Sequence, residues 1–268
     1  MSMFENLFKQ MRKRRNRKLS EKARRRHASR IEYMITDDVT FEVAEAFRNF
    51  KAALTVSMPR KQSDEGVAVM MTSASPEDGK TTVTVNLALM LAMSEAKVVL
   101  LDADVRKGRV AKYFRKKSAP GLADYLSGLA SLDDVTHQAD ENENLSYITC
   151  GTHSPRPYEL LESDEMKNLL QELKQKYDYI IIDTPPLLLV SDALALVPGV
   201  DGAVLVCRHE VTYVSDIARS LDKLEFAKAK VLGVVVNDFK AREKMPLANY
   251  DRYKYYNYTY SNDDVSKA

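Results

Sequence analysis

The sequence has few residues of the kinds that build disulfide frameworks or zinc sites. It contains two cysteines, Cys150 and Cys207, and four histidines scattered along 268 residues. Neither their number nor their spacing suits a disulfide-stabilised fold or a Cys/His metal site. We therefore expect two buried thiols in a reducing compartment.

A long apolar run is also missing. No stretch approaches 18 consecutive apolar residues, and the N-terminal residues include no apolar signal-peptide segment. We therefore expect a cytoplasmic protein without a membrane span. Hydrophobic residues make up 45% of the chain, which is enough for the core of one α/β domain of about 200–250 residues plus tails.

A strong net charge is absent too, since the formal value is +2, but one stretch is very basic. Residues 9–30 carry twelve Lys or Arg and one acid, and four apolar residues at helical spacing come before or within them: Phe4, Leu7, Phe8 and Met11. An amphipathic helix joined to a basic run is typical of an anchor on an anionic membrane surface, so we predict that role for residues 1–30. A solvated tail and a docking arm for an acidic partner or nucleic acid are the alternatives. No aromatic residue is interleaved with the charges, which argues against nucleic acid.

The stretch Ala74-Ser75-Pro76-Glu77-Asp78-Gly79-Lys80-Thr81 has the spacing of a phosphate-binding loop. It follows an apolar run, residues 67–71, and precedes a helical pattern. Backbone N–H groups of such a loop and the N-terminus of the following helix form an anion cradle. We predict that residues 75–82, Thr82 included, bind a nucleotide. Within them, Lys80 would contact the β- and γ-phosphates and Thr81 would hold Mg²⁺. The alternative is an ordinary turn between a strand and a helix.

Two further apolar runs end in carboxylates. Residues 98–101 lead into Asp102 and Asp104, and residues 179–182 lead into Asp183. In an open parallel sheet, ligands bind outside the carboxyl ends of the strands. Together with the loop, these aspartates predict a Mg²⁺–nucleotide site for ATP or GTP.

Apolar runs alternate with helical patterns along the middle of the chain. We expect strands at 67–73, 97–102, 145–150, 178–183, 202–207 and 231–237, and helices at 37–58, 80–94, 121–129, 159–176, 190–197 and 212–227. This order predicts an α/β fold of the P-loop NTPase type, a Rossmann-like sandwich with a mostly parallel sheet covered by helices on both faces. The expected parts are a basic extension (1–36), the P-loop domain (37–240) and a C-terminal tail (241–268).

The tail is rich in tyrosine. Six of the 14 tyrosines lie within eleven residues: Tyr250, Tyr253, Tyr255, Tyr256, Tyr258 and Tyr260. Their spacing has no consistent period, so they cannot bury one face of a regular element. Beside an ATP site, the cluster is interpreted as a phosphorylation substrate. The alternative is an aromatic tail that packs on its own domain or on a partner.

From about Phe41 to Tyr260 the sequence resembles the bacterial tyrosine kinases of capsular and exopolysaccharide systems. The resemblance rests on the loop beginning Ser-Ala-Ser-Pro, on the tyrosine tail, and on four motifs: Leu-Leu-Asp-Ala-Asp-Val-Arg (100–106), Arg-Pro-Tyr-Glu-Leu-Leu (156–161), Ile-Ile-Asp-Thr-Pro-Pro (181–186) and Val-Val-Val-Asn (234–237). It implies an ATP- and Mg²⁺-dependent autokinase that acts on the tail in trans. The partitioning ATPases of the MinD type and a non-catalytic adaptor are the alternatives.

The resemblance also implies residue roles. Lys80 and the loop amides would bind phosphates, Thr81 and Asp104 would hold Mg²⁺ with Asp183, and Asp102 would be the base that deprotonates the acceptor tyrosine. Asn237 is a candidate for contacting adenine. The His-Arg-Asp and Asp-Phe-Gly motifs of eukaryotic kinases are absent from the sequence.

Assembly and partners are implied as well. The family's E-x-x-R-x-x-R oligomerisation motif is matched by Glu45 and Arg48, with Lys51 in place of the last arginine. The resemblance predicts a ring-like homo-oligomer when unphosphorylated, a separate transmembrane activator (a polysaccharide co-polymerase), a cognate tyrosine phosphatase, and a place at the inner face of the plasma membrane.

Overall fold

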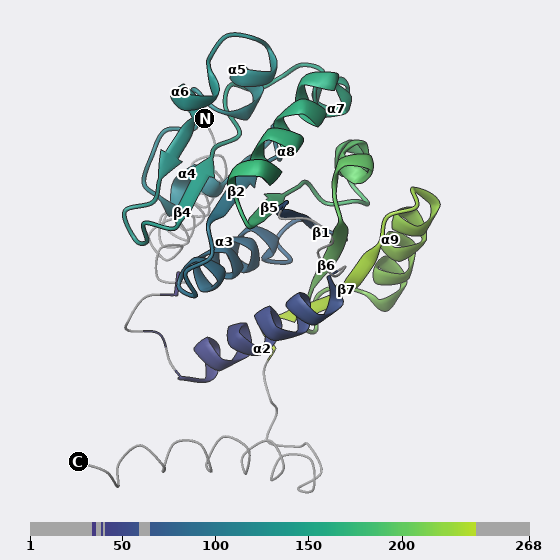
Figure 1. Ribbon diagram of the computed structural model, residues 1–268. Helices are drawn as coiled ribbons and strands as arrows, with labels where there is room; N and C mark the ends of the chain where they lie inside the picture. Colours follow the sequence, from purple (N-terminus) through teal and green to yellow (C-terminus); the bar gives the residue numbers. More distant parts are fainter. Residues whose placement is uncertain (1–33, 36–38, 40, 59–64, 240–268) are drawn as a thin grey trace, which may run out of the picture. The chain divides into compact units, whose positions relative to one another are not determined.

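The computed structural model describes residues 34–35, 39, 41–58 and 65–239 (Figure 1). The predicted N-terminal helix, the basic run up to residue 30 and the tyrosine cluster lie outside these residues. The chain divides into two compact units after Asn237, and the described helices and strands all belong to the first.

The described strands form one sheet with the order β3-β4-β2-β5-β1-β6-β7. All neighbouring pairs are parallel except β3 and β4. The mostly parallel sheet is therefore confirmed, whereas the short antiparallel edge strand β3 was not predicted. The bounds are β1 Val67–Ser73, β2 Val98–Asp102, β3 Thr136–Gln138, β4 Leu145–Ile148, β5 Tyr179–Asp183, β6 Gly202–Arg208 and β7 Val231–Asn237.

Helices connect the strands and cover the sheet. Their bounds are α2 Phe41–Ser57, α3 Lys80–Ala92, α4 Val110–Tyr113, α5 Leu122–Leu126, α6 Leu132–Val135, α7 Pro157–Glu162, α8 Asp164–Lys176, the 3₁₀-helix η2 Asp192–Gly199 and α9 Val214–Phe226. None of the described helices is long and apolar enough to cross a membrane.

Three of the predicted helices differ from the structure. The helix expected at 121–129 is the shorter α5, which ends at Leu126. The helix expected at 159–176 is broken at Ser163, whose extended backbone ends α7 and whose hydroxyl caps α8 by accepting the Met166 N–H at 3.2 Å. The helix expected at 190–197 is the 3₁₀-helix η2, which contains Pro198. Proline has no N–H to donate, so it favours a helix end over an α-helix interior.

Alternate residues of the central strand β1 pack into two separate cores. Val69 and Met71 lie in the core with α2, α3 and α4, whereas Ala68 and Met70 lie in the core with α5, α7, α8, η2 and α9. Figure 1 shows α2 and α3 on one side of the sheet and α7 and α8 on the other. Both faces are therefore covered at the centre, and this fixes where the strand ends meet.

The edges of the fold are less enclosed. Val231, Val234 and Val236 of the edge strand β7 are exposed, unlike the residues of β1, β2 and β4. The two cysteines are buried and unpaired, as predicted.

Candidate active site

The predicted phosphate-binding loop joins β1 to α3 and is shaped from within. Gly79 has φ +86°, a backbone conformation that glycine adopts readily, and Glu77 has φ +68°. The buried Asp78 carboxylate accepts the Ser75 N–H at 2.8 Å across the loop. Helix α3 begins at Lys80, so its free N–H groups face the space that the loop encloses.

The end of β7 supports the loop from outside. The Asn237 side-chain amide donates to the Asp78 carbonyl oxygen at 3.0 Å. A Cβ atom on Gly79 would lie 1.9 Å from the same Asn237 nitrogen, so another residue would displace this amide besides being strained at φ +86°. The structure thus places Asn237 against the loop, while its predicted contact with adenine stays a prediction.

The segment between β6 and α9 provides a third attachment. The Thr212 hydroxyl donates to the second carboxylate oxygen of Asp78 at 2.8 Å and accepts the Arg208 N–H at 2.7 Å. Burial raises the pKa of Asp78, partly offset by these hydrogen bonds from Ser75 and Thr212. Nothing in the sequence marks Thr212, which belongs to no motif and lies 134 residues from its partner.

The Asp183 carboxylate, at the end of β5, contacts three side chains of α3. The Lys80 ammonium lies 2.5 Å from one carboxylate oxygen, and the Thr81 hydroxyl donates to the other at 2.7 Å. The Thr84 hydroxyl lies 3.3 Å from the first oxygen. Sequence reasoning missed Thr84, although its position one helical turn after Lys80 and Thr81 could have indicated it.

Asp102 lies beside Asp183 because β2 and β5 are neighbours, and the two aspartates are register partners. Its carboxylate is fully buried and accepts N–H groups from Val110 at 3.0 Å and Asp104 at 3.2 Å. Burial and the charge of Asp183 raise the pKa of Asp102 to about 8. The structure therefore provides a buried carboxylate that takes up a proton near neutral pH.

The loop after β2 is held by its own ion pair. Asp104 is half-buried and accepts the Lys107 N–H at 3.0 Å. Two residues further, Arg106 makes two hydrogen bonds to the buried Asp192 of η2, at 2.5 and 3.1 Å. Hydrogen bonding to Asp192 raises the pKa of Arg106. This pair, which sequence reasoning also missed, joins the loop carrying Asp104 to the segment after β5.

The remaining predicted loop residues divide into two groups. Pro76 and Glu77 are exposed, whereas the Thr82 hydroxyl lies 2.6 Å from the Tyr113 hydroxyl of α4. Thr82 therefore connects α3 to α4, and its predicted contact with nucleotide stays a prediction.

The oxygen donors at this edge of the sheet fit Mg²⁺. Thr81, Asp104 and Asp183 supply a hydroxyl and two carboxylates, and Mg²⁺ usually takes one or two carboxylates together with water and substrate phosphates. The described residues contain no cluster of three or more His, Cys, Asp or Glu suited to holding a metal by themselves. The donor set thus suits an ion that arrives with a nucleotide.

The predicted oligomerisation residues lie on α2. Arg48 donates to Glu45 at 3.0 Å on an exposed face, and Lys51 donates to the Ser94 hydroxyl just after α3. Glu45 and Arg48 are accessible to a second chain, and their role in assembly stays a prediction.

Known proteins resemble this chain in sequence and in fold. A family model described as an AAA domain matches residues 77–215. The tyrosine-protein kinase YwqD of Bacillus subtilis is 38% identical over 189 residues, covering 70% of this chain and 77% of that protein. The chain belongs to the bacterial tyrosine-kinase family.

Solved structures agree with the family. The kinase domain of the Escherichia coli tyrosine kinase ETK aligns with a TM-score of 0.67 and 31% identity, covering 76% of this chain and 80% of that one. The cell division ATPase MinD of Pyrococcus furiosus aligns less closely, with a TM-score of 0.56 and 26% identity, covering 70% and 80%. The P-loop NTPase-like fold is therefore confirmed.

Family members differ in length. The chain spans only 27% of the tyrosine-protein kinase ptk of Acinetobacter johnsonii, which is 33% identical over 205 residues, or 76% of this chain. The kinase family resemblance thus concerns one part of such longer proteins.

Proposed function

We propose that this chain is an ATP-dependent protein-tyrosine kinase that phosphorylates the tyrosines of residues 250–260 in a second copy of itself. The observation that carries the proposal is the Asp102 carboxylate, buried beside Asp183 at the edge of the sheet where the phosphate-binding loop lies. A general base works best when its pKa lies near the operating pH, and the pKa of Asp102 is raised to about 8.

Phosphoryl transfer depends mainly on positioning and on neutralising charge. The loop N–H groups and the Lys80 ammonium bind the phosphates of ATP. Asp102 in its ionised form accepts the proton of the tyrosine hydroxyl while the phenol oxygen bonds to the γ-phosphorus and the bond to ADP breaks. Thr81, Asp104 and Asp183 would hold Mg²⁺, which neutralises phosphate charge when bound. Asn237 would contact adenine.

Phosphorylation regulates assembly in this proposal. Copies associate through Glu45, Arg48 and Lys51 in a ring, and each presents its tail to a neighbour. Each phosphate adds about −1.5 to −2 charge, so six would add roughly −9 to −12 and drive the copies apart. Size-exclusion chromatography of phosphorylated and dephosphorylated protein tests this, and identical elution would contradict it.

The cellular setting follows the family. The chain acts in the cytoplasm at the inner face of the plasma membrane, with a separate transmembrane activator and a cognate phosphatase, and regulates capsular or exopolysaccharide synthesis and export. Residues 1–30 help to hold it there. Failure of anionic liposomes to retain the protein, with unchanged location after deletion of residues 1–30, would refute the membrane role.

The deciding experiment is phosphosite mapping after incubation with Mg²⁺-ATP, with and without a cytoplasmic fragment of the activator. We expect phosphate on the tyrosines of residues 250–260, and none in Lys80→Met, which lacks the ammonium group at the phosphates. ATP hydrolysis with an unmodified tail under both conditions would refute the kinase and favour a MinD-like ATPase.

A further inference from the structure

A dense group of positive charges follows the Asp104 loop. Residues 106–117, here called the basic segment, contain seven Lys or Arg among twelve residues: Arg106, Lys107, Arg109, Lys112, Arg115, Lys116 and Lys117. The reaction described above uses none of these side chains. The segment therefore needs an explanation of its own.

The basic segment is fastened to the active site along its length. Near its start, the Val110 N–H donates to the Asp102 carboxylate at 3.0 Å. In its middle, the Tyr113 hydroxyl lies 2.6 Å from that of Thr82, the neighbour of Thr81. Next, the Phe114 ring stacks on Tyr147 of β4 with centroids 4.1 Å apart. The first two contacts hold residues 110–113 beside the base and the first turn of α3, and the third joins the segment to β4.

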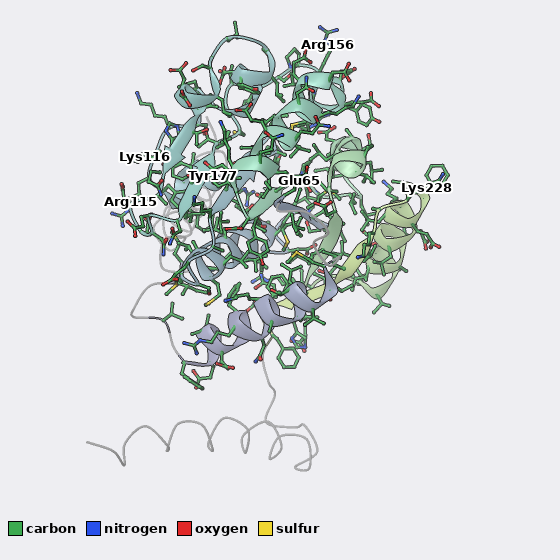
Figure 2. The ribbon with its side chains drawn as sticks, viewed as in Figure 1. Glu65, Arg115, Lys116, Arg156, Tyr177 and Lys228 are labelled. Carbon is green, nitrogen blue, oxygen red and sulfur yellow. The ribbon has the colours of Figure 1, made fainter. Side chains whose placement is uncertain are left out.

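Most of these charges are available to a ligand. Arg106 is paired with Asp192, and Lys116 lies 3.8 Å from Asp140. The other five have no ion pair within the part of the chain that the structure describes, and all are exposed except the half-exposed Arg109. Figure 2 shows Arg115 and Lys116 at the border of the molecule in this view. The basic segment thus carries five positive charges without an ion pair among the described residues.

The tail changes its charge when it is phosphorylated. Residues 241–268 contain five basic and four acidic side chains, so the unmodified tail is nearly neutral. Two phosphotyrosines add about −3 to −4. Only a modified tail therefore complements the basic segment strongly.

We propose that the basic segment binds phosphotyrosines already formed on a tail while a neighbouring, unmodified tyrosine of the same tail occupies the site at Asp102. This rests on the proposed kinase function and adds an order to it. Each bound phosphotyrosine keeps the tail at the enzyme for transfer to the next tyrosine, so that successive transfers occur without release of the tail.

The spacing of the tyrosines suits this arrangement. An extended chain advances about 3.3–3.6 Å per residue, so Tyr255 lies about 7 Å and Tyr258 about 17 Å along the tail from Tyr253. The basic segment begins two residues after Asp104. The segment therefore starts four residues after the base Asp102, and phosphotyrosines two to five residues beyond the acceptor Tyr253 lie at distances that a segment of twelve residues can span.

The available charge also sets a limit. Five free cations balance two to three phosphates, which carry about −3 to −6. A tail with six phosphates carries a charge of roughly −9 to −12, which exceeds the positive charge of the segment. The repulsion among its phosphates is then no longer neutralised. The same surface thus retains a partly modified tail and releases a fully modified one.

The test uses the full chain with Tyr→Phe changes at all six tail positions, so that an added peptide is the acceptor. Two fluorescein-labelled peptides of residues 246–262 keep Tyr253 as acceptor, with the other tyrosines as Phe. One of them carries phosphotyrosine at positions 255 and 258. Fluorescence anisotropy gives Kd at low and high salt, and transfer from Mg²⁺-ATP in the presence of the activator fragment gives kcat/KM.

Two variants are compared in this background. The triple variant Lys112→Gln, Arg115→Gln and Lys117→Gln removes three free charges of the basic segment. The matched control Lys228→Gln, Lys230→Gln and Arg219→Gln removes two lysines and one arginine at exposed positions on and after α9. Lys228 lies on the opposite side of the view from Arg115 in Figure 2.

We expect the phosphorylated peptide to bind about tenfold more tightly and to react with about tenfold higher kcat/KM than the unmodified one, since a few exposed ion pairs give effects of this order. The triple variant should lose that preference and keep its rate on the unmodified peptide. In the unaltered background, high salt should weaken the preference for the phosphorylated peptide. The control variant should retain the preference.

Equal Kd values for the two peptides in the unaltered background would overturn the proposal, even if both are phosphorylated. Loss of binding to phosphatidylserine vesicles in the triple variant, with the peptide preference intact, would assign the segment to a membrane surface and also overturn it. Preferential binding without transfer to either peptide would instead refute the kinase function while supporting the docking surface.

Discussion

The carboxylate of Asp102 gives a sharp prediction about stability and pH. In the unfolded chain this group titrates at its ordinary pKa of 3.8, whereas in the folded protein burial and the Asp183 charge raise the pKa to about 8. Between these values the folded protein binds a proton that the unfolded chain does not. The free energy of unfolding must therefore fall as pH rises through this window.

The size of the effect follows from one proton. Its slope is at most about 1.4 kcal/mol per pH unit, so from pH 5 to pH 7 the Asp102 contribution falls by about 2–3 kcal/mol. Asp102→Asn removes this titration. It also replaces an oxygen that accepts the Val110 or Asp104 N–H with an amide group, which costs about 1–3 kcal/mol at every pH. The slope, rather than the absolute stability, is the quantity to compare.

Urea unfolding in EDTA at pH 5, 6 and 7 measures it. We expect a less negative pH slope for Asp102→Asn than for the unaltered protein. Asp164→Asn is the control, because its ion pair with Lys167 lowers the pKa of this exposed carboxylate and its titration lies below the window. Equal slopes in the unaltered protein and Asp102→Asn would refute the assigned proton, and with it the reason for choosing Asp102 as the base.

Three further substitutions test the contacts around the site. Arg106→Ala leaves the buried Asp192 without its partner and should lower the free energy of unfolding by about 2 kcal/mol, measured by urea titration. If Arg106→Ala lowers the free energy of unfolding just as much in the Asp192→Asn background, this explanation is wrong. Gly79→Ala forces a Cβ against the Asn237 amide at φ +86°, so we expect a cost of about 1–3 kcal/mol and weakened binding of a fluorescent ATP analogue; unchanged affinity would count against the loop geometry. Tyr147→Phe keeps the stack on Phe114 and removes a buried hydroxyl that has no hydrogen-bond partner in the described part of the chain. It should raise the thermal midpoint, reflecting about 1 kcal/mol, and a lowered midpoint would show that the hydroxyl is satisfied.

Sequence patterns predicted the central features of the site because parallel strands end at the same edge of a sheet. Asp102 and Asp183 were expected to meet on that ground, and they are register partners. The loop, its helix and the strands on either side could be predicted because each is a local pattern of apolar residues and turns. The buried state of Cys150 and Cys207 also followed from their places at strand ends.

The contacts that fix the loop could not be predicted in this way. Asn237 and Thr212 bond Asp78 across 159 and 134 residues, and no periodicity relates such distant positions. The break at Ser163 was missed because the apolar pattern continues through it, while the extended backbone at this one residue separates α7 from α8. Strand β3 has three residues, none of them buried, and therefore leaves no hydrophobic pattern.

The strand order also dictates when, during synthesis, the site can exist. Strand β1 lies between β5 and β6, so a ribosome that has made the phosphate-binding loop must add more than a hundred residues before both neighbours of that strand are available. The hydrogen bond that holds the loop backbone forms later still, because its donor Asn237 is the last residue of the last described strand. At about 5–20 residues per second, the nascent chain spends many seconds without a formed site. The six tyrosines of residues 250–260 follow that residue, so translation completes the site before it adds the proposed acceptors.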